Sequence, residues 1–267
     1  MKTITVINAK GGCGKNTIAM NLASGLSLRD KRVLLMDLDP QAQVTQWLQA
    51  GDGLSPEGTL VTALLGHQSL TDVIQPIRFP NISFVASASG LEDLGREISA
   101  TDGYPAMLTE LLAREEVADR FDYLIIDSPN QISPIMESAI FPADAFIIPF
   151  ESTKAVKSYA SVYQLLLKLR PNADYQLLHV LSNLTRHPGL RNRVLEAFKT
   201  DGLKPADTEI RSCGWMAQVD EEGGSILHWR PKSNGAEDMR KLGEEVIALL
   251  ENANGPHAHP AVSRIAA

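Results

Sequence analysis

The sequence has little cysteine and no long apolar stretch. Only two cysteines, Cys13 and Cys213, occur among 267 residues. Neither a disulfide framework nor a zinc site built from several cysteines is possible, which fits a reducing, cytoplasmic setting. No apolar run approaches the roughly 18 residues that a membrane span requires. Because an apolar strand begins near Thr3, we expect no cleaved leader segment.

An excess of basic residues is also missing, since the formal net charge is −7. This excludes a protein that is basic all over, although a local basic face is still possible. The hydrophobic content of 44% is enough for one sizeable core. We find neither internal repeats nor a domain linker. We therefore predict a single domain over residues 1–251 and a disordered tail over residues 252–267, which is rich in Asn, Gly, Pro, His and Ala.

Apolar runs that suit strands alternate with patterns that suit helices. The runs Val33–Met36 and Tyr123–Ile126 are apolar without alternation, which is typical of strands buried on both faces of a parallel sheet. The pattern predicts an α/β fold with a doubly wound, mostly parallel sheet and helices on both faces. Strands are predicted at Thr3–Ile7, Arg32–Met36, Ile82–Ala86, Tyr123–Ile126, Ala145–Pro149, Gln176–Ser182 and near Thr208–Ile210, and helices at Lys15–Leu28, Ala42–Gln49, Leu60–Leu65, Tyr104–Ala118, Thr153–Leu169, Gly189–Lys199 and Ala236–Glu251.

A glycine-rich segment, Lys10-Gly11-Gly12-Cys13-Gly14-Lys15, joins the first predicted strand to the first predicted helix. Glycines let the backbone curl so that several N–H groups point inward, and the positive end of the helix dipole faces the same space. This order of strand, loop and helix predicts a phosphate cradle, with Lys15 reaching the outer phosphates. The alternative is a turn that serves only close packing, but packing does not require the two lysines.

Acidic residues follow two further predicted strands. Asp37 and Asp39 end the second strand, and Asp127 ends the apolar run that begins at Tyr123. In an open parallel sheet, ligands bind beyond the carboxyl ends of the strands, so these side chains are expected beside the loop. A carboxylate so placed is typical of a Mg²⁺ site. The alternative for Asp37 and Asp39 is capping of the following helix.

The loop departs from the strict phosphate-loop pattern at Ala9, where a glycine is usual, and at Asn16, where a hydroxyl is usual. With its additional lysine, Lys10, it resembles the deviant phosphate loop of the ParA/MinD superfamily of dimerising ATPases. Asp37-Leu38-Asp39-Pro40-Gln41 resembles the first switch of that family, and Asp127-Ser128-Pro129 resembles the second. The resemblance extends to Gly223-Gly224-Ser225-Ile226 and covers about residues 1–250.

The resemblance implies a role for each matching residue. Lys10 reaches the nucleotide of a partner subunit, Lys15 binds phosphates within its own subunit, and Asp39 positions the attacking water. It implies ATP or ADP held by Gly11, Gly12, Cys13, Gly14, Lys15, Asn16, Thr17 and Asn183, and Mg²⁺ near Asn16, Asp37 and Asp127. For Asn183, the alternative is a residue that only forms a turn.

Asn16 counts against ordinary turnover. The oxygen of Asn lies one bond further from the backbone than a Ser or Thr hydroxyl, and Mg²⁺ requires oxygens at about 2.0–2.1 Å in near-octahedral geometry. We therefore expect weakened Mg²⁺ binding and a slow, weak ATPase.

Several branches of the superfamily fit poorly. Nitrogenase-type iron proteins need more cysteines, the tail lacks the basic amphipathic helix of MinD-like membrane binders, and no second substrate site indicates a synthetase. The branch that remains is that of the ParA-like positioning ATPases. The resemblance then implies an ATP-dependent homodimer located on the nucleoid. It also implies a cargo such as a plasmid, chromosome or carboxysome, and an adaptor protein of ParB-like role. The alternatives are a metabolic enzyme or a nucleotide switch without hydrolysis on the same fold.

Binding to DNA without sequence preference requires basic residues on one face. Our candidates are Arg191, Arg193, Arg211 and Lys232. Acidic residues lie between them in the sequence, so the alternative is an ordinary solvated surface.

Overall fold

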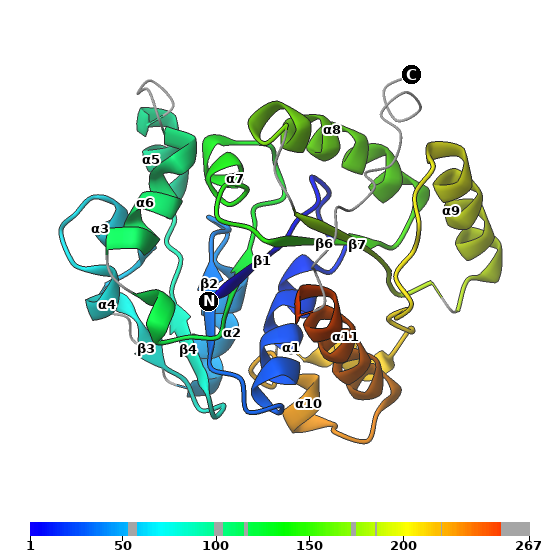
Figure 1. The fold of residues 1–267 in the computed structure, drawn as a ribbon. Coiled ribbons are helices and arrows are strands. Elements are labelled where there is room, and N and C mark those ends of the chain that lie inside the picture. Colours follow the sequence, from blue (N-terminus) through cyan, green and yellow to red (C-terminus); the bar gives the residue numbers. More distant parts are fainter. Residues whose placement is uncertain are drawn as a thin grey trace.

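The computed structural model describes residues 1–52, 58–98, 104–114, 117–171, 175–184, 186–219 and 221–251. The predicted tail, 252–267, lies outside the described residues. One sheet with the strand order β3-β4-β2-β5-β1-β6-β7 runs through the molecule (Figure 1). Its strands are β1 (Lys2–Val6), β2 (Val33–Asp37), β3 (Gln75–Pro76), β4 (Ile82–Val85), β5 (Tyr123–Asp127), β6 (Ala145–Phe150) and β7 (Gln176–Leu181).

The central strands pair in parallel, and every residue of β2, β5 and β6 is buried. Among the described strands, only the two-residue β3 runs antiparallel to its neighbour, β4. In the register between β2 and β5, Asp37 lies opposite Asp127, and Val6 of β1 also pairs with Asp127. The carboxyl ends of three adjacent strands therefore meet at one edge of the sheet, which confirms the predicted fold class.

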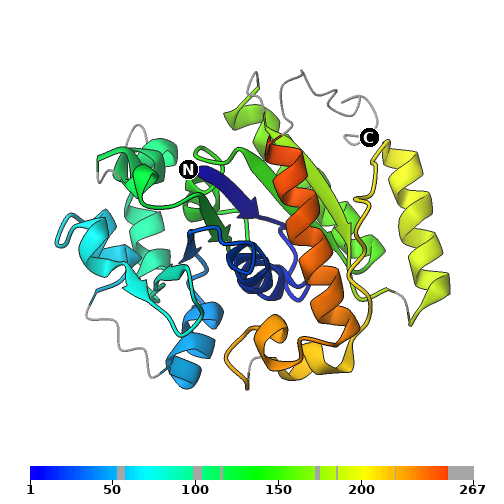
Figure 2. The same cartoon turned by 60° about the horizontal axis from the view of Figure 1, so that its bottom comes forward.

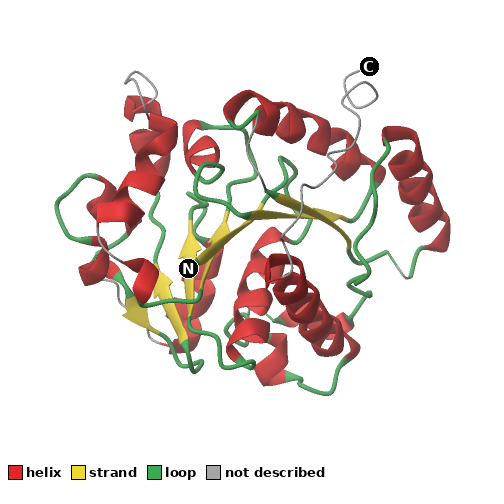
Figure 3. Cartoon of the chain, in the orientation of Figure 1, coloured by secondary structure: helices red, strands yellow, loops and turns green. Residues whose placement is uncertain are grey.

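Helices cover both faces of this sheet (Figure 3). Apolar residues of β1 and β2 such as Ile4 and Leu35 pack in one core with the helices of the first face, whereas Leu34 and Ile148 pack in the cores of the second. The first face carries α1 (Lys15–Ser27), α2 (Gln43–Asp52), α10 (Ile226–Trp229) and α11 (Asn234–Glu251); the second carries α3 (Leu60–Leu64), α4 (Leu70–Val73), α5 (Gly90–Ile98), α6 (Met107–Arg114), α7 (Pro134–Ser138), α8 (Thr153–Leu169) and α9 (Pro188–Asp201). Three short 3₁₀ turns, Tyr104–Ala106, Val117–Asp119 and Gly214–Gln218, complete the described elements.

Helix α1 lies beside α11 on the same face of the sheet (Figure 2). Most of its residues are buried. The two helices approach closely where Gly25 faces Gly243. A Cβ on Gly25 would come within 3.1 Å of the carbonyl oxygen of Met239, and a Cβ on Gly243 within 3.5 Å of the backbone of Gly25. This contact fixes the helix that follows the glycine-rich loop, and with it the position of the loop.

Two local predictions were wrong. The strand expected near Thr208–Ile210 is not formed. The segment runs parallel to β7 but pairs with it only through isolated bridges, of Pro205 with His179 and of Ile210 with Ser182. The helix expected over Tyr104–Ala118 consists of a 3₁₀ turn, α6 and, after the undescribed residues 115–116, a second 3₁₀ turn. The prediction also omitted β3, α4, α5, α7 and α10, most of which are too short to show a period.

Candidate functional site

The glycine-rich loop forms the floor of a cavity of about 530 Å³ at the carboxyl edge of the sheet. Gly12 and Gly14 have φ values of 75° and 94°, a left-handed region that L side chains rarely adopt. Gly14 is the N-cap of α1, so the first N–H groups of the helix open onto this cavity. The cavity is lined by loop residues together with Lys15, Asn16, Thr17, Asp39, Gln41, Gln43, Gln46, Trp47, Asn130, Met216 and Val219. The volume and the donors suit a polyphosphate.

The two lysines of the loop have different surroundings. The side chain of Lys15 is buried, and its Nζ lies 3.2 Å from the carbonyl oxygen of Lys10. Lys10 turns to the other side, where its Nζ lies 2.5 Å from Oε1 of Glu151, directly after β6. The sulfur of Cys13 packs against the carbonyl of Lys10 at 3.1 Å, and burial raises the pKa of its thiol. The lysine expected to reach a partner is therefore held within its own chain.

Asp127 is fully buried, and among the residues that the structure describes we find no hydrogen-bond partner for either of its carboxylate oxygens. Burial raises its pKa well above the usual range, and the neighbouring charge of Asp37 raises it further, whereas Lys15 acts in the opposite direction. Buried carboxylates without partners are rare because each costs free energy. Two such oxygens beside a phosphate-type loop fit a hydrated divalent cation.

Asp37 is equally buried but fully engaged. Its Oδ2 accepts hydrogen bonds from the backbone N–H and the hydroxyl of Thr45 at 3.0 and 2.8 Å, and its Oδ1 accepts from the N–H of Asp39 at 3.0 Å. Burial raises its pKa to about 7, although the bonds from Thr45 lower it. The carboxylate thus ties β2 to the start of α2, which corresponds to the capping alternative. Its predicted role near Mg²⁺ stays a prediction.

Asp39 lines the cavity with a largely buried side chain. Its Oδ1 accepts from the N–H of Gln41 at 2.9 Å, and its carbonyl accepts from the hydroxyl of Ser87 at 2.7 Å. These contacts fix the segment after β2, so that Asp39 and the glycine-rich loop line the same cavity.

Asn16 occupies the position of the expected hydroxyl, on the first turn of α1. Its Nδ2 donates to Oε1 of Gln43, at the start of α2, at 2.8 Å. This bond joins the phosphate-type loop to the segment that carries Asp39. Thr17 follows and lines both the main cavity and a smaller one.

The smaller cavity, of about 220 Å³, continues from the loop on the side of β7. Asn183 lies at its edge, with an exposed side chain and a φ of 55°, and its N–H donates to the carbonyl of Ile210 at 2.8 Å. The left-handed backbone supports the turn-forming alternative, and the position beside the cavity supports the contact with a base. The lining includes Cys13, Thr17, Ile18, Glu151, Ser182, Asn183, Ile210, Arg211, Met216 and Met239.

Sequence reasoning missed Thr45, Ser87, Glu151 and Met216. Only Glu151 carried a usable signal, because it follows a predicted strand at the same edge as Asp39 and Asp127. Nothing local marks Thr45 or Met216, which reach the site only through the packing of α2 and of the turn Gly214–Gln218.

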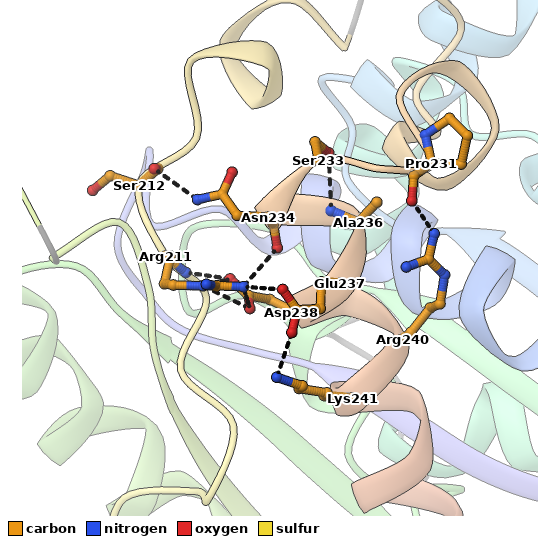
Figure 4. Close-up of polar contacts among 10 residues, drawn as sticks. All are labelled: Arg211, Ser212, Pro231, Ser233, Asn234, Ala236, Glu237, Asp238, Arg240 and Lys241. Atoms are coloured by element: carbon orange, nitrogen blue, oxygen red, sulfur yellow. Dashed lines mark hydrogen bonds and ion pairs between the residues drawn. The ribbon is translucent and has the colours of Figure 1, made fainter.

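The predicted DNA-binding residues differ in how their charge is used. Arg211 donates to Asp238 and Glu237 at 2.7 Å each (Figure 4), and Arg191 pairs with Glu209 at 2.9 Å. Both guanidinium groups are therefore neutralised inside the chain. For Arg193 and Lys232, by contrast, both exposed, we find no side-chain hydrogen bond or ion pair within the part of the chain that the structure describes. The role of all four in binding DNA stays a prediction.

A parallel sheet with a glycine loop capping α1 and acidic strand ends beside it defines a P-loop nucleotide-binding fold. A family model described as an AAA domain matches residues 1–177. The chain is 30% identical to a ParA family protein of Chlamydia trachomatis, over 94% of this chain and 100% of that one. It is also 30% identical to the chromosome-partitioning ATPase Soj of Thermus thermophilus, over 95% and 98%. The chain belongs to the ParA family, which confirms the resemblance noted from the loop and the two switches.

Solved structures agree on the fold. Apo McdA of Cyanothece superposes with a TM-score of 0.80 at 22% identity, over 92% of this chain and 99% of that one. Within the described residues, we find no helix long and apolar enough to cross a bilayer.

Proposed function

We propose that this protein is a ParA-like ATPase that dimerises around bound ATP, binds DNA without sequence preference and positions a cargo. The buried carboxyl of Asp127 beside the loop carries the proposal. For its two oxygens we find no hydrogen-bond partner in the described residues, so the group is neutral by protonation until a cation compensates its charge. The names of relatives support the same reading: they include partitioning and cell-division proteins, and a McdA–ATP complex is among the similar structures.

In this proposal the phosphates lie against the N–H groups at the start of α1, and Lys15 compensates their charge. Asp127 and Asp37 would help to hold Mg²⁺, which would supply positive charge for the phosphates and for the departing ADP. The base occupies the smaller cavity beside Asn183. Asp39 orients the water that attacks the terminal phosphate.

Dimerisation requires Lys10 to exchange one anion for another. In the isolated chain its ammonium pairs with Glu151. In the dimer it contacts the phosphates of the partner's nucleotide, where a charge-assisted hydrogen bond contributes about 1.5–3 kcal/mol. Because the ion pair with Glu151 must break, the net free energy that Lys10 contributes to dimerisation is smaller than this. We therefore expect the dimer to require the larger negative charge of ATP and to be weaker with ADP.

The second candidate is a nucleotide switch with little or no hydrolysis, and the contact between Asn16 and Gln43 favours it. The amide nitrogen of Asn16 donates to Gln43, on the segment that follows Asp39. The side chain of Asn16 therefore does not offer a hydroxyl to Mg²⁺, as the family residue at this position does. Weak turnover and no turnover are two degrees of the same effect.

Three measurements test the nucleotide site, the dimer and the DNA binding of the proposed function, and phosphate release distinguishes an ATPase from a switch without hydrolysis. Calorimetry with ATP and ADP, with Mg²⁺ or EDTA, tests the site itself, and no uptake under any condition would refute the proposal. Sedimentation with ATP or ADP tests the dimer. Retention of random duplex DNA, expected only with ATP and falling steeply with salt, tests the positioning role, whereas a dimer without DNA binding would point to a metabolic enzyme. A ParB-like adaptor should accelerate release from DNA.

A further inference from the structure

Two tryptophans hold an arginine at the surface near the nucleotide cavity. The Cζ atom of Arg230 lies 4.6 Å from the ring centroid of Trp215 and 4.6 Å from that of Trp229. The two rings stand nearly perpendicular, at 89°, with centroids 5.7 Å apart. Trp215 remains 45% exposed. We call these three residues the Arg230 cluster.

The backbone of Arg230 is fixed as well as its side chain. It caps α10: its N–H donates to the carbonyl of Ile226 at 2.8 Å, and its carbonyl accepts from the N–H of Ser233 at 2.9 Å. For the guanidinium we find no hydrogen bond or ion pair within the described residues. Its five N–H donors are thus held in place by the two rings and are available to an anion.

The charges around the cluster favour an anionic partner. Lys232 is exposed two residues further on, again with no acidic partner in the described part of the chain. The acidic residues at the start of α11 are already neutralised, since Asp238 and Glu237 pair with Arg211, and Glu237 also pairs with Lys241 (Figure 4). Arg230 and Lys232 are therefore cations without an acidic partner among the described residues, whereas the exposed Glu221 and Glu222 lie on the segment between the turn Gly214–Gln218 and α10.

We propose that the Arg230 cluster, together with Lys232, is a contact surface for the phosphate backbone of duplex DNA. The inference rests on the proposed function and names the residues that perform its DNA-binding step. A guanidinium stacked on aromatic rings presents its donors edge-on, in the geometry that suits phosphate oxygens. In this proposal the Arg230 cluster, rather than Arg211 and Arg191, contacts DNA, because the charges of those two arginines are neutralised by ion pairs within the chain.

The position of the cluster explains how nucleotide controls it. Trp215 and Met216 are adjacent on the 3₁₀ turn Gly214–Gln218. Successive side chains on a 3₁₀ turn point about 120° apart. Met216 lines both the main cavity and the smaller cavity, whereas Trp215 contacts Arg230. A nucleotide that contacts Met216 can therefore shift the 3₁₀ turn whose Trp215 packs against Arg230.

The test compares variants of the full chain by fluorescence anisotropy on a labelled random-sequence duplex, with a non-hydrolysable ATP analogue and Mg²⁺, across a series of salt concentrations. Arg230→Gln should weaken binding about three- to tenfold and reduce the salt slope by about 1 for each lost phosphate contact. Trp215→Leu should weaken binding, whereas Trp215→Phe should largely restore it. The matched control is Arg120→Gln, which removes an exposed arginine that also lies over an aromatic ring, Phe121, at 5.7 Å.

Sedimentation of each variant with the same analogue reports dimerisation separately. The inference is supported if Arg230→Gln loses affinity for DNA and still dimerises. It is overturned if the wild-type chain binds DNA and Arg230→Gln binds equally well, or if Arg230→Gln loses the dimer itself, because the cluster would then be a contact between two copies of the chain. If the wild-type chain binds ATP and dimerises but does not bind DNA, the proposed DNA-binding function fails first, and the inference fails with it.

Discussion

Replacing Asp127 by Asn is expected to stabilise the nucleotide-free protein at neutral pH. The carboxyl is fully buried with both oxygens unpartnered, and burial raises its pKa well above the usual range. Between the unfolded pKa of about 3.9 and the raised folded pKa, the folded state binds a proton that the unfolded state has lost. The contribution of this group to stability therefore falls as pH rises through that window.

The magnitude follows from the two protonation states. Within this window, each pH unit lowers the free energy of unfolding of the wild-type protein by about 1.4 kcal/mol. The Asn amide does not titrate, but its buried N–H₂ group costs about 1–3 kcal/mol if it finds no partner. The variant should be more stable than the wild type once the pH lies more than about two units above the unfolded pKa. The difference in the free energy of unfolding should then grow by about 1.4 kcal/mol per pH unit up to the folded pKa.

Urea unfolding in EDTA without nucleotide, followed by circular dichroism at several pH values, measures this difference. Glu110→Gln, at an exposed position of α6, is the control and should leave the pH dependence unchanged. A constant difference between Asp127→Asn and wild type across the pH range would refute the reasoning. With saturating ATP and Mg²⁺ the order should reverse, because the wild-type protein gains binding free energy that the variant lacks.

The remaining predictions concern the contacts around the loop. Asn16→Thr should raise the rate of ATP turnover, measured as phosphate release; equal rates would show that Asn16 does not limit hydrolysis. Glu151→Gln frees Lys10, so the ATP-bound dimer should form at lower protein concentration in sedimentation, and an unchanged midpoint would remove Glu151 from the dimerisation equilibrium. Thr45→Val removes a hydroxyl that donates to the buried Asp37 and should lower the free energy of unfolding by about 1–3 kcal/mol. A loss below about 0.5 kcal/mol in urea unfolding would mean that water replaces the hydroxyl.

Much of the fold was predictable because it depends on patterns that are local in the chain. The runs Val33–Met36 and Tyr123–Ile126 are apolar at every position, and both are strands buried on both faces. The helix after the glycine loop begins at Lys15, as expected. Short elements such as α7 and β3 were not predictable, because so few residues carry no distinguishing period.

The charged groups of the site show where local reasoning stops. A strand that ends in an acid indicates that the acid lies at the carboxyl edge of the sheet. Asp37 and Asp127 lie opposite each other at that edge, and Asp39 lines the cavity. It does not indicate which carboxylate finds a partner. Thr45 donates a hydrogen bond to Asp37, whereas we find no donor to Asp127 among the described residues. This difference arises from the way α2 packs on the sheet.

The sequence by itself determined the class of the site, because glycines at positions of left-handed backbone, a lysine at the start of α1 and acids at strand ends are properties of the chain one segment at a time. Only the tertiary structure decided the state of each charge. Lys10 forms an ion pair with Glu151, and Arg211 is neutralised by acidic residues of α11. Arg230 packs against two tryptophans, and its N–H donors can bind an anion. The physical reason is that burial and ion pairing depend on groups far apart in the sequence, and a linear pattern does not contain their distances.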